Sequence, residues 1–160
     1  MTLKRKRGKE LVTIERNPIE PHLLGEEELH EFISELQYAK PKSAAKWLKN
    51  YLPTVRVIYA FQILFHTNKE DDWKVVHTVQ GNIWNALDGI FQADGEGFSN
   101  REGYHILWQF SDHVTGTWNM AVLAETGRWR IFQMDLGNPE HRKAFLAGKV
   151  PKGVKSKQGV

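Results

Sequence analysis

Hydrophobic positions recur with helical spacing over the first third of the chain. Apolar residues at i, i+3, i+4 and i+7 predict an amphipathic helix that starts near Glu26 and ends before Pro41. These apolar residues are Leu29, Phe32, Ile33 and Leu36. Glutamates in the first turn favour the positive end of the helix dipole. Ser43 is expected to cap a second helix that runs to Leu52 and stops at Pro53.

Further along the chain the pattern changes to that of β-strands. Residues 54–66 carry β-branched and aromatic side chains on both faces, which predicts a central strand, and residues 11–14 could form a short one. A long helix is expected over 71–87 and should stop at Gly89. Four more strands are expected at 90–93, 104–110, 118–122 and 129–136.

Two local signals predict how the last elements are connected. The residues Glu125-Thr126-Gly127 are typical of a hairpin turn. Asn138 followed by Pro139 is typical of a capped helix start, which predicts a short last helix that ends at Gly148.

The order of elements predicts an α+β fold. Two N-terminal helices precede a β-α-β-β-β-β, mainly antiparallel, curved sheet, with helices packed on one face and a short C-terminal helix. The other face stays open for a protein partner, a ligand or the second copy of a homodimer. We expect one domain over 11–148, between a basic disordered tail at 1–10 and a basic tail at 149–160.

An eleven-residue polar segment, 93–103, separates two of the predicted strands. Hairpin connections usually take two to five residues, so a longer charged one is a place for function. Counted from Asp94, the fifth and sixth positions of a calcium loop would be Phe98 and Ser99, which does not match the EF-hand pattern. No lysine follows Gly95 and Gly97 at the spacing of a phosphate-binding loop. We therefore predict no metal and no cofactor.

Composition narrows the function classes. The chain has no cysteine, which excludes disulfides, thiolate metal sites and a cysteine nucleophile. No apolar run approaches the roughly 20 residues of a membrane span, and no secretory leader follows the basic start, so we expect a cytoplasmic protein.

Charge is distributed unevenly along the chain. Nine of the 22 basic residues lie in 1–9 and 149–160, which leaves 13 basic against 19 acidic residues, about −6, in 10–148. The simplest interpretation is that the tails aid solubility or dock on the acidic body. They could also bind nucleic acid weakly and with strong salt dependence.

Several side chains are candidates for binding. The polar segment offers Glu96, Asn100, Arg101 and Glu102. His105 is expected on the strand face opposite Phe110. The three strand tryptophans could form the core or, on an open face, stack into a platform for a sugar, a cation or a base; they are Trp108, Trp118 and Trp129. Two further candidates, Arg128 and Arg130, could receive a carboxylate or phosphate, or form cross-strand ion pairs.

Our leading hypothesis is a non-enzymatic module that binds a protein or small molecule through the open sheet face and residues 93–103. It depends on the missing nucleophile, metal and phosphate signatures. One alternative is a small hydrolase or isomerase, with Glu96 or Glu102 as general base and Arg128 or Arg130 stabilising an anion. The other is nucleic-acid association through the tails.

Overall fold

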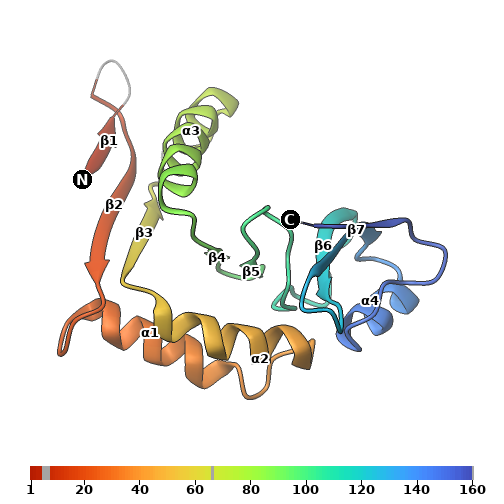
Figure 1. The fold of residues 1–160 in the computed structure, drawn as a ribbon. Helices are drawn as coiled ribbons and strands as arrows, with labels where there is room; N and C mark the ends of the chain where they lie inside the picture. Colours follow the sequence, from red (N-terminus) through yellow and green to blue (C-terminus); the bar gives the residue numbers. More distant parts are fainter. Residues whose placement is uncertain (5–7, 66, 160) are drawn as a thin grey trace. The chain divides into compact units, whose positions relative to one another are not determined.

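The computed structural model describes residues 1–4, 8–65 and 67–159, shown as a ribbon in Figure 1. Within these residues the chain forms four α-helices and eight strands, and the strands make three small antiparallel sheets. The α+β class is therefore confirmed. The single curved sheet in the order β-α-β-β-β-β is wrong, because the strands pair in separate groups rather than in one continuous sheet.

The chain divides into two compact units. Unit 1 consists of Met1–Glu31 and Thr54–Gly89, and unit 2 of Phe32–Pro53 and Ile90–Val160. The helix α1 (Leu24–Glu35) starts in unit 1 and ends in unit 2. The single domain over 11–148 stays a prediction.

Unit 1 is built on a three-stranded antiparallel sheet in the order β1-β2-β3. Its strands are β1 (Thr2–Lys4), β2 (Glu10–Pro18) and β3 (Val57–Ile63). The central strand is β2, so the prediction of a central strand at 54–66 is wrong. β2 is the longest of the three and hydrogen-bonds to both neighbours, which leaves β3 half-buried at the edge. The segment expected to be a disordered tail contains β1, and its residues 5–7 lie outside the described residues.

The helix α3 (Glu70–Leu87) covers one face of this sheet and confirms the long helix predicted there. Val76 is buried with Leu11, Val12 and Ile14 of β2. The helix ends at Leu87, and its C-cap is Asp88, whose φ of 54° is left-handed, one residue before the stop expected at Gly89.

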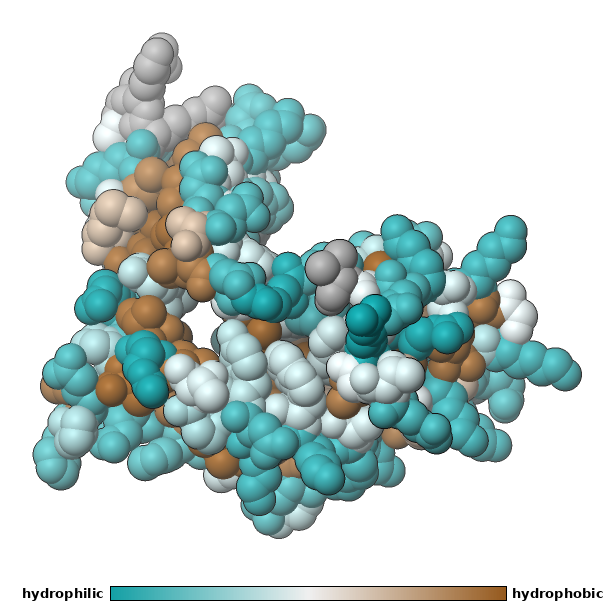
Figure 2. Space-filling model, in the orientation of Figure 1, coloured by the Kyte–Doolittle hydropathy of each residue, from teal (hydrophilic) through white to brown (hydrophobic). Residues whose placement is uncertain are grey.

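Large apolar side chains are exposed mainly on unit 1. Of the eight such residues in the described chain, seven belong to unit 1 and Tyr38 belongs to unit 2. The seven are Met1, Leu23, Leu24, Ile63, Phe65, Trp73 and Leu87. Figure 2 shows apolar residues gathered over the strands of unit 1, beside α3. One of the seven, Ile63, lies on a strand of the sheet, and the others lie on helices, connecting segments or the N-terminus.

Unit 2 carries the other two sheets. In one, β4 (Phe91–Ala93) pairs with β5 (Gly97–Ser99), and the other has the order β6-β7-β8. Its strands are β6 (Thr117–Leu123), β7 (Trp129–Asp135) and β8 (Ser156–Gln158). The helices of this unit are the end of α1, α2 (Lys42–Tyr51) and α4 (Pro139–Leu146). A short 3-10 helix, Leu52–Thr54, follows α2.

Local signals in unit 2 are mostly confirmed. The hairpin between β6 and β7 closes through a bond from Ala124 N–H to Arg128 O at 2.9 Å. The Asn138 side chain caps α4 by accepting from the N–H groups of Glu140 and His141. Ser43 does not cap α2, because the helix begins one residue earlier, after Pro41.

The polar segment 93–103 is a hairpin rather than an open loop. β4 and β5 pair across the turn at 94–96, and residues 97–100 are all buried. Gly97 has a φ of 90°, and a Cβ there would lie 3.1 Å from Leu107 O, so a side chain does not fit. Only the 94–96 turn and residues 101–103 reach the surface of unit 2.

Two segments of unit 2 differ from the strand prediction. Residues 104–110 form no strand and join the sheets only through isolated bridges at His105. The segment expected to be a basic tail, 149–160, contains β8, which pairs with β7 through Arg130, Ile131 and Phe132.

A largely buried ion pair ties the start of β2 to α3. Lys9 Nζ lies 2.7 Å from Asp72 Oδ2, and the side chains are 32% and 0% exposed respectively. Asp72 also lies in the first turn of α3, where the helix dipole favours a carboxylate.

We expect Lys9→Met to lower the free energy of unfolding by about 2 kcal/mol, because it leaves the Asp72 carboxylate buried without this cation. Asp72→Asn should cost less, since Lys9 can then turn to water. Urea unfolding followed by circular dichroism measures both. Lys74→Gln, which removes an exposed ion pair on the same helix, is the control and should leave the midpoint unchanged. Equal midpoints for Lys9→Met and Lys74→Gln would contradict this role of the pair.

Candidate functional site

His105 is the centre of a polar cluster inside unit 2. The residue is 9% exposed, its Nδ1 lies 3.3 Å from Ser99 Oγ, and its Nε2 lies 3.9 Å from Glu96 Oε2. The imidazole also packs edge-on against Phe110 and Trp118, with ring centroids 5.1 and 5.3 Å away. Two of the predicted candidates, Glu96 and Trp118, therefore meet at His105.

Backbone hydrogen bonds fix the position of His105. Its N–H donates to Asn119 O at 2.9 Å, and its carbonyl accepts from Ala121 N–H at 2.8 Å. It also forms a bridge with Ser99 of β5, so it links β5 to β6. The prediction that His105 and Phe110 face opposite ways is wrong, because residues 104–110 do not form a strand and the alternation of faces is lost.

Serine, histidine and glutamate are the residue types of a nucleophile, a base and an acid. A nucleophile must reach its substrate, and Ser99 is 3% exposed. The aromatic rings of Phe110 and Trp118 also cover His105. The geometry therefore suits a buried polar network that holds the hairpin in place.

Burial determines the protonation of His105. Desolvation disfavours the charged imidazolium and lowers the pKa of His105 below its usual 6.5. Because the unfolded chain then binds the proton more readily than the folded chain, this residue stabilises the fold fully only above about pH 6.5.

We therefore expect wild-type stability to fall as the pH is lowered from 6.5 toward the folded-state pKa of His105. His105→Gln should remove this part of the pH dependence. As the pH is lowered, the free energy of unfolding of the wild type should therefore fall relative to that of the variant. Urea unfolding at several pH values from 7.5 to 5 tests this. His77→Gln changes an exposed histidine and should preserve the wild-type dependence. An unchanged pH dependence in His105→Gln would show that other groups cause it.

Asn100 organises the turn that follows β5. The residue is 2% exposed, and its Oδ1 accepts from Glu102 N–H at 3.1 Å and Tyr104 N–H at 3.0 Å. Its Nδ2 has no hydrogen-bond partner among the described residues. Asn100 is thus placed to shape the backbone, whereas Arg101 and Glu102 are exposed at the turn.

Asn100→Ala should lower the free energy of unfolding by about 1–2 kcal/mol, because two backbone N–H groups lose their acceptor. Asn119→Ala, which removes an exposed bond to Gln133, is the matched control and should change stability less. Thermal unfolding compares the two. If both variants match the wild type, Asn100 does not hold the turn.

The three strand tryptophans are not brought together. Trp108 and Trp118 each pack against Phe110, with ring centroids 5.3 and 4.9 Å away. Trp129 is 8% exposed and packs against Trp47 of α2 at 5.2 Å. The three-tryptophan platform is therefore not formed, and Trp129 is part of the interior.

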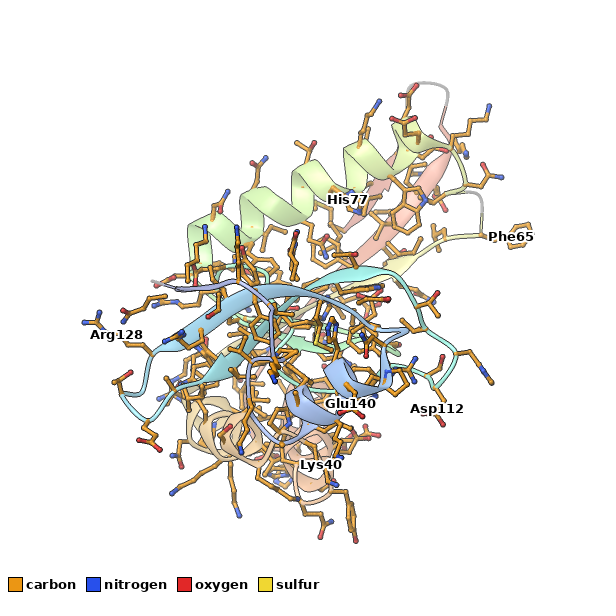
Figure 3. The ribbon with its side chains drawn as sticks, turned by 90° about the vertical axis from the view of Figure 1, so that its right-hand side faces the viewer. Lys40, Phe65, His77, Asp112, Arg128 and Glu140 are labelled. Atoms are coloured by element: carbon orange, nitrogen blue, oxygen red, sulfur yellow. The ribbon has the colours of Figure 1, made fainter. Side chains whose placement is uncertain are left out.

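The two candidate arginines lie near the β6-β7 hairpin. Arg130 Nη2 donates to Ser156 Oγ at 3.0 Å, so it braces β8. Arg128 is exposed and projects from the molecule (Figure 3). In the described part of the chain, no ion pair joins either arginine to Glu96 or Glu102.

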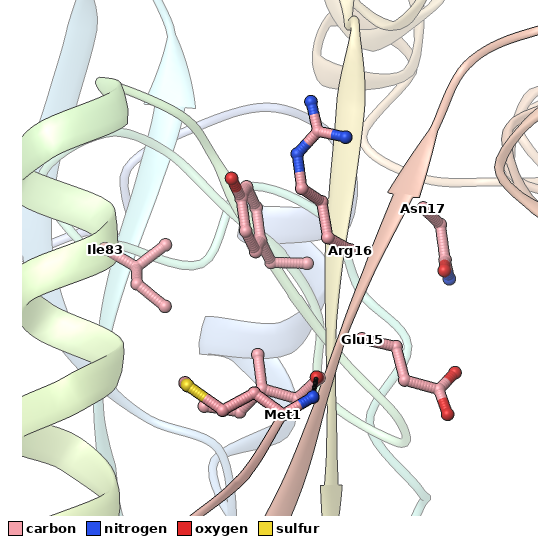
Figure 4. A pocket seen from close by; sticks show the side chains of 7 residues that line it. Met1, Glu15, Arg16, Asn17 and Ile83 are labelled. Carbon is pink, nitrogen blue, oxygen red and sulfur yellow. Dashed lines mark hydrogen bonds between the residues drawn. The ribbon is translucent and has the colours of Figure 1, made fainter.

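A hollow in unit 1 is a site that the sequence interpretation missed. It has a volume of about 500 Å³ and is open to solvent. Its lining residues are Met1, Ile14, Glu15, Arg16, Asn17, Tyr59 and Ile83. In Figure 4, Arg16 and Ile83 lie on the α3 side of the sheet, whereas Glu15 and Asn17 point away from it.

Strand alternation places a cation on the apolar side of β2. Successive side chains of a strand point to opposite faces, so Val12, Ile14 and Arg16 share one face of β2. The first two belong to the core of unit 1. Arg16 lies opposite Tyr59 of β3 in the strand register. An arginine in an otherwise apolar row is the sequence signal that could have indicated this site.

Among the described residues, no group of three or more His, Cys, Asp or Glu side chains could hold a metal ion. No helix there is both long and apolar enough to cross a membrane. Comparisons with protein-family models, curated proteins and solved structures find no match to this chain.

Proposed function

We propose that the protein is a non-enzymatic binding module whose unit 1 holds a small ligand with an apolar body and an anionic group. The observation that carries the proposal is the guanidinium of Arg16 at an apolar hollow. Ile14, Ile83 and the ring of Tyr59 supply the apolar walls. Concave apolar sites with a few polar groups are the usual form of ligand sites.

The charge of Arg16 is available to a ligand. In the residues that the structure describes, no carboxylate or carbonyl accepts a hydrogen bond from its guanidinium. A planar guanidinium binds a carboxylate or phosphate through two parallel bonds, so an anionic group is the chemistry that fits. The Tyr59 hydroxyl, across the strand register from Arg16, is a second polar group at the same site.

The exposed apolar side chains support placing the binding function on unit 1. Seven of the eight exposed large hydrophobic residues lie there. One of them, Met1, lines the hollow. In contrast, the buried residues 97–100 make the polar segment of unit 2 a poorer binding surface than we expected.

Neither alternative function is favoured by a comparable observation. The enzymatic alternative requires a carboxylate beside Arg128 or Arg130, and Glu96 instead lies beside His105. The nucleic-acid alternative depends on free cations in the tails. Two of these, Lys4 and Lys9, form ion pairs with Glu10 and Asp72.

The test uses two ligands with the same chain and opposite charge, decanoate and decyltrimethylammonium, in isothermal titration calorimetry. Wild type should prefer decanoate. Arg16→Gln should weaken decanoate binding about five- to tenfold, or about 1–1.4 kcal/mol, because a solvent-accessible charged hydrogen bond is lost. Ile83→Gln should weaken both ligands, because it makes one wall of the hollow polar.

The matched control is Arg56→Gln, which removes an exposed arginine elsewhere in unit 1. It should leave decanoate binding at the wild-type level, and circular dichroism confirms that each variant is folded. If Arg56→Gln and Arg16→Gln have equal effects, or if the cationic ligand binds as well as decanoate, the proposed site is wrong.

A further inference from the structure

β3 is an edge strand with one free side. Among the strands that the structure describes, it pairs with β2 alone, along Val57–Ile63. The backbone bonds that flank it, Ile19 N–H to Arg56 O and Leu64 N–H to Leu11 O, also lie on the β2 side. In the described residues, its other side therefore presents a row of unpaired N–H and C=O groups.

The composition of β3 does not protect this free side. Edge strands normally carry lysine, proline or a bulge, or are very short, and these features prevent pairing with another chain. β3 is seven residues long, has the sequence Val-Ile-Tyr-Ala-Phe-Gln-Ile, and contains no charged residue, proline or glycine. Ile63 at its end is 39% exposed.

Of the other sheet edges in the described residues, β1 and β8 have this protection, and the edge strand β6 is covered at its middle by the backbone bonds of His105 to Asn119 and Ala121. β1, the opposite edge of the same sheet, is three residues long, contains Lys4, and has an irregular register beside it. β8, at one edge of the unit 2 sheet, is also three residues long and contains Lys157. Among these four edges, β3 is the long one that neither a charge nor a neighbouring segment covers in the described residues.

The sequence of β3 is complementary to itself in the antiparallel direction. With two copies paired around Ala60, Tyr59 of one copy lies opposite Phe61 of the other, and Val57 lies opposite Ile63. Aromatic pairs and β-branched pairs are favourable cross-strand neighbours. All four residues share one face, since successive side chains alternate.

We propose that β3 pairs with β3 of a second copy of this chain, giving a two-fold homodimer with a continuous six-stranded sheet. A two-fold axis at Ala60 uses the same strand of both copies and so closes the assembly. It satisfies both rows of free backbone groups at once. Phe65, which is 94% exposed and projects from unit 1 in Figure 3, lies two residues beyond this pairing and opposite Val55 of the second copy.

This inference does not depend on the ligand hollow. Tyr59 lines the hollow with its ring, whereas the hydrogen bonds of the proposed pairing come from the backbone of β3. Ala60 alternates to the other face of the sheet, where it lies opposite Glu15 of β2. A lysine at position 60 would therefore be compatible with the folded monomer, because it gains a favourable cross-strand partner.

Ala60→Lys is the decisive variant, because two lysines would face each other at the two-fold axis of the dimer. Sedimentation velocity over a range of concentrations should show wild type at twice the monomer mass and Ala60→Lys at the monomer mass. Thr13→Lys places the same charge on the same sheet face, on the central strand. This control should remain dimeric.

A mixing experiment excludes misfolding as the cause. Ala60→Glu combined with Glu15→Gln, which avoids two carboxylates opposite each other in the sheet, should also be monomeric, and an equimolar mixture with Ala60→Lys should restore the dimer mass through opposite charges at the axis. A wild type that is monomeric throughout, or larger than a dimer, overturns the proposal. So does a dimer that Ala60→Lys leaves intact, or a mixture that stays monomeric.

Discussion

The central position of β2 is the constraint on which the rest of unit 1 depends. This strand hydrogen-bonds to both neighbours and contributes Leu11, Val12 and Ile14 to the core. Because β2 occupies the centre, β3 is left at an edge with one side free. The alternation of β2 also places Arg16 in the same row as Val12 and Ile14. The hollow and the free edge are both consequences of this single placement.

In unit 2, a buried polar residue holds part of the structure together. Its hairpin, residues 91–99, is held by a polar residue, His105, which bridges β5 and β6 through its backbone and contacts Ser99 through its ring. Buried polar groups are tolerated only where they find partners, and most of those in this cluster do. Such a network fixes one arrangement of the hairpin, but it leaves little surface for a ligand. Unit 1, in contrast, has a hollow that is open to solvent, and we therefore place ligand binding there.

Elements with local signals could be predicted from the sequence, and strand partners could not. Helix spacing, the Asn138 cap and the β6-β7 hairpin are each specified within a few residues. By contrast, β2 reads as Glu-Leu-Val-Thr-Ile-Glu-Arg-Asn-Pro, and its charges and final proline hide a nine-residue central strand. Residues 104–110 show the opposite error. Their alternating apolar pattern is real, but the consecutive residues His105, Ile106 and Leu107 are all buried, so burial does not follow the alternation of a strand.

Because contacts between distant residues cannot be predicted from the sequence, the candidate site at 93–103 was also predicted incorrectly as an exposed loop. Polar residues in a glycine-rich segment indicated an exposed loop, because sequence spacing does not show that Ser99 and Asn100 have buried partners at His105 and Tyr104. The sequence of β2 also did not single out Arg16, because charged residues surround it. The pairing of Arg16 with Tyr59 is known only from the strand register. In β3 the ring of Tyr59 belongs to the hollow while the backbone of the same residue belongs to the edge. Ligand binding and the hydrogen bonds of self-pairing therefore use different groups of one strand, so the two proposed functions are compatible.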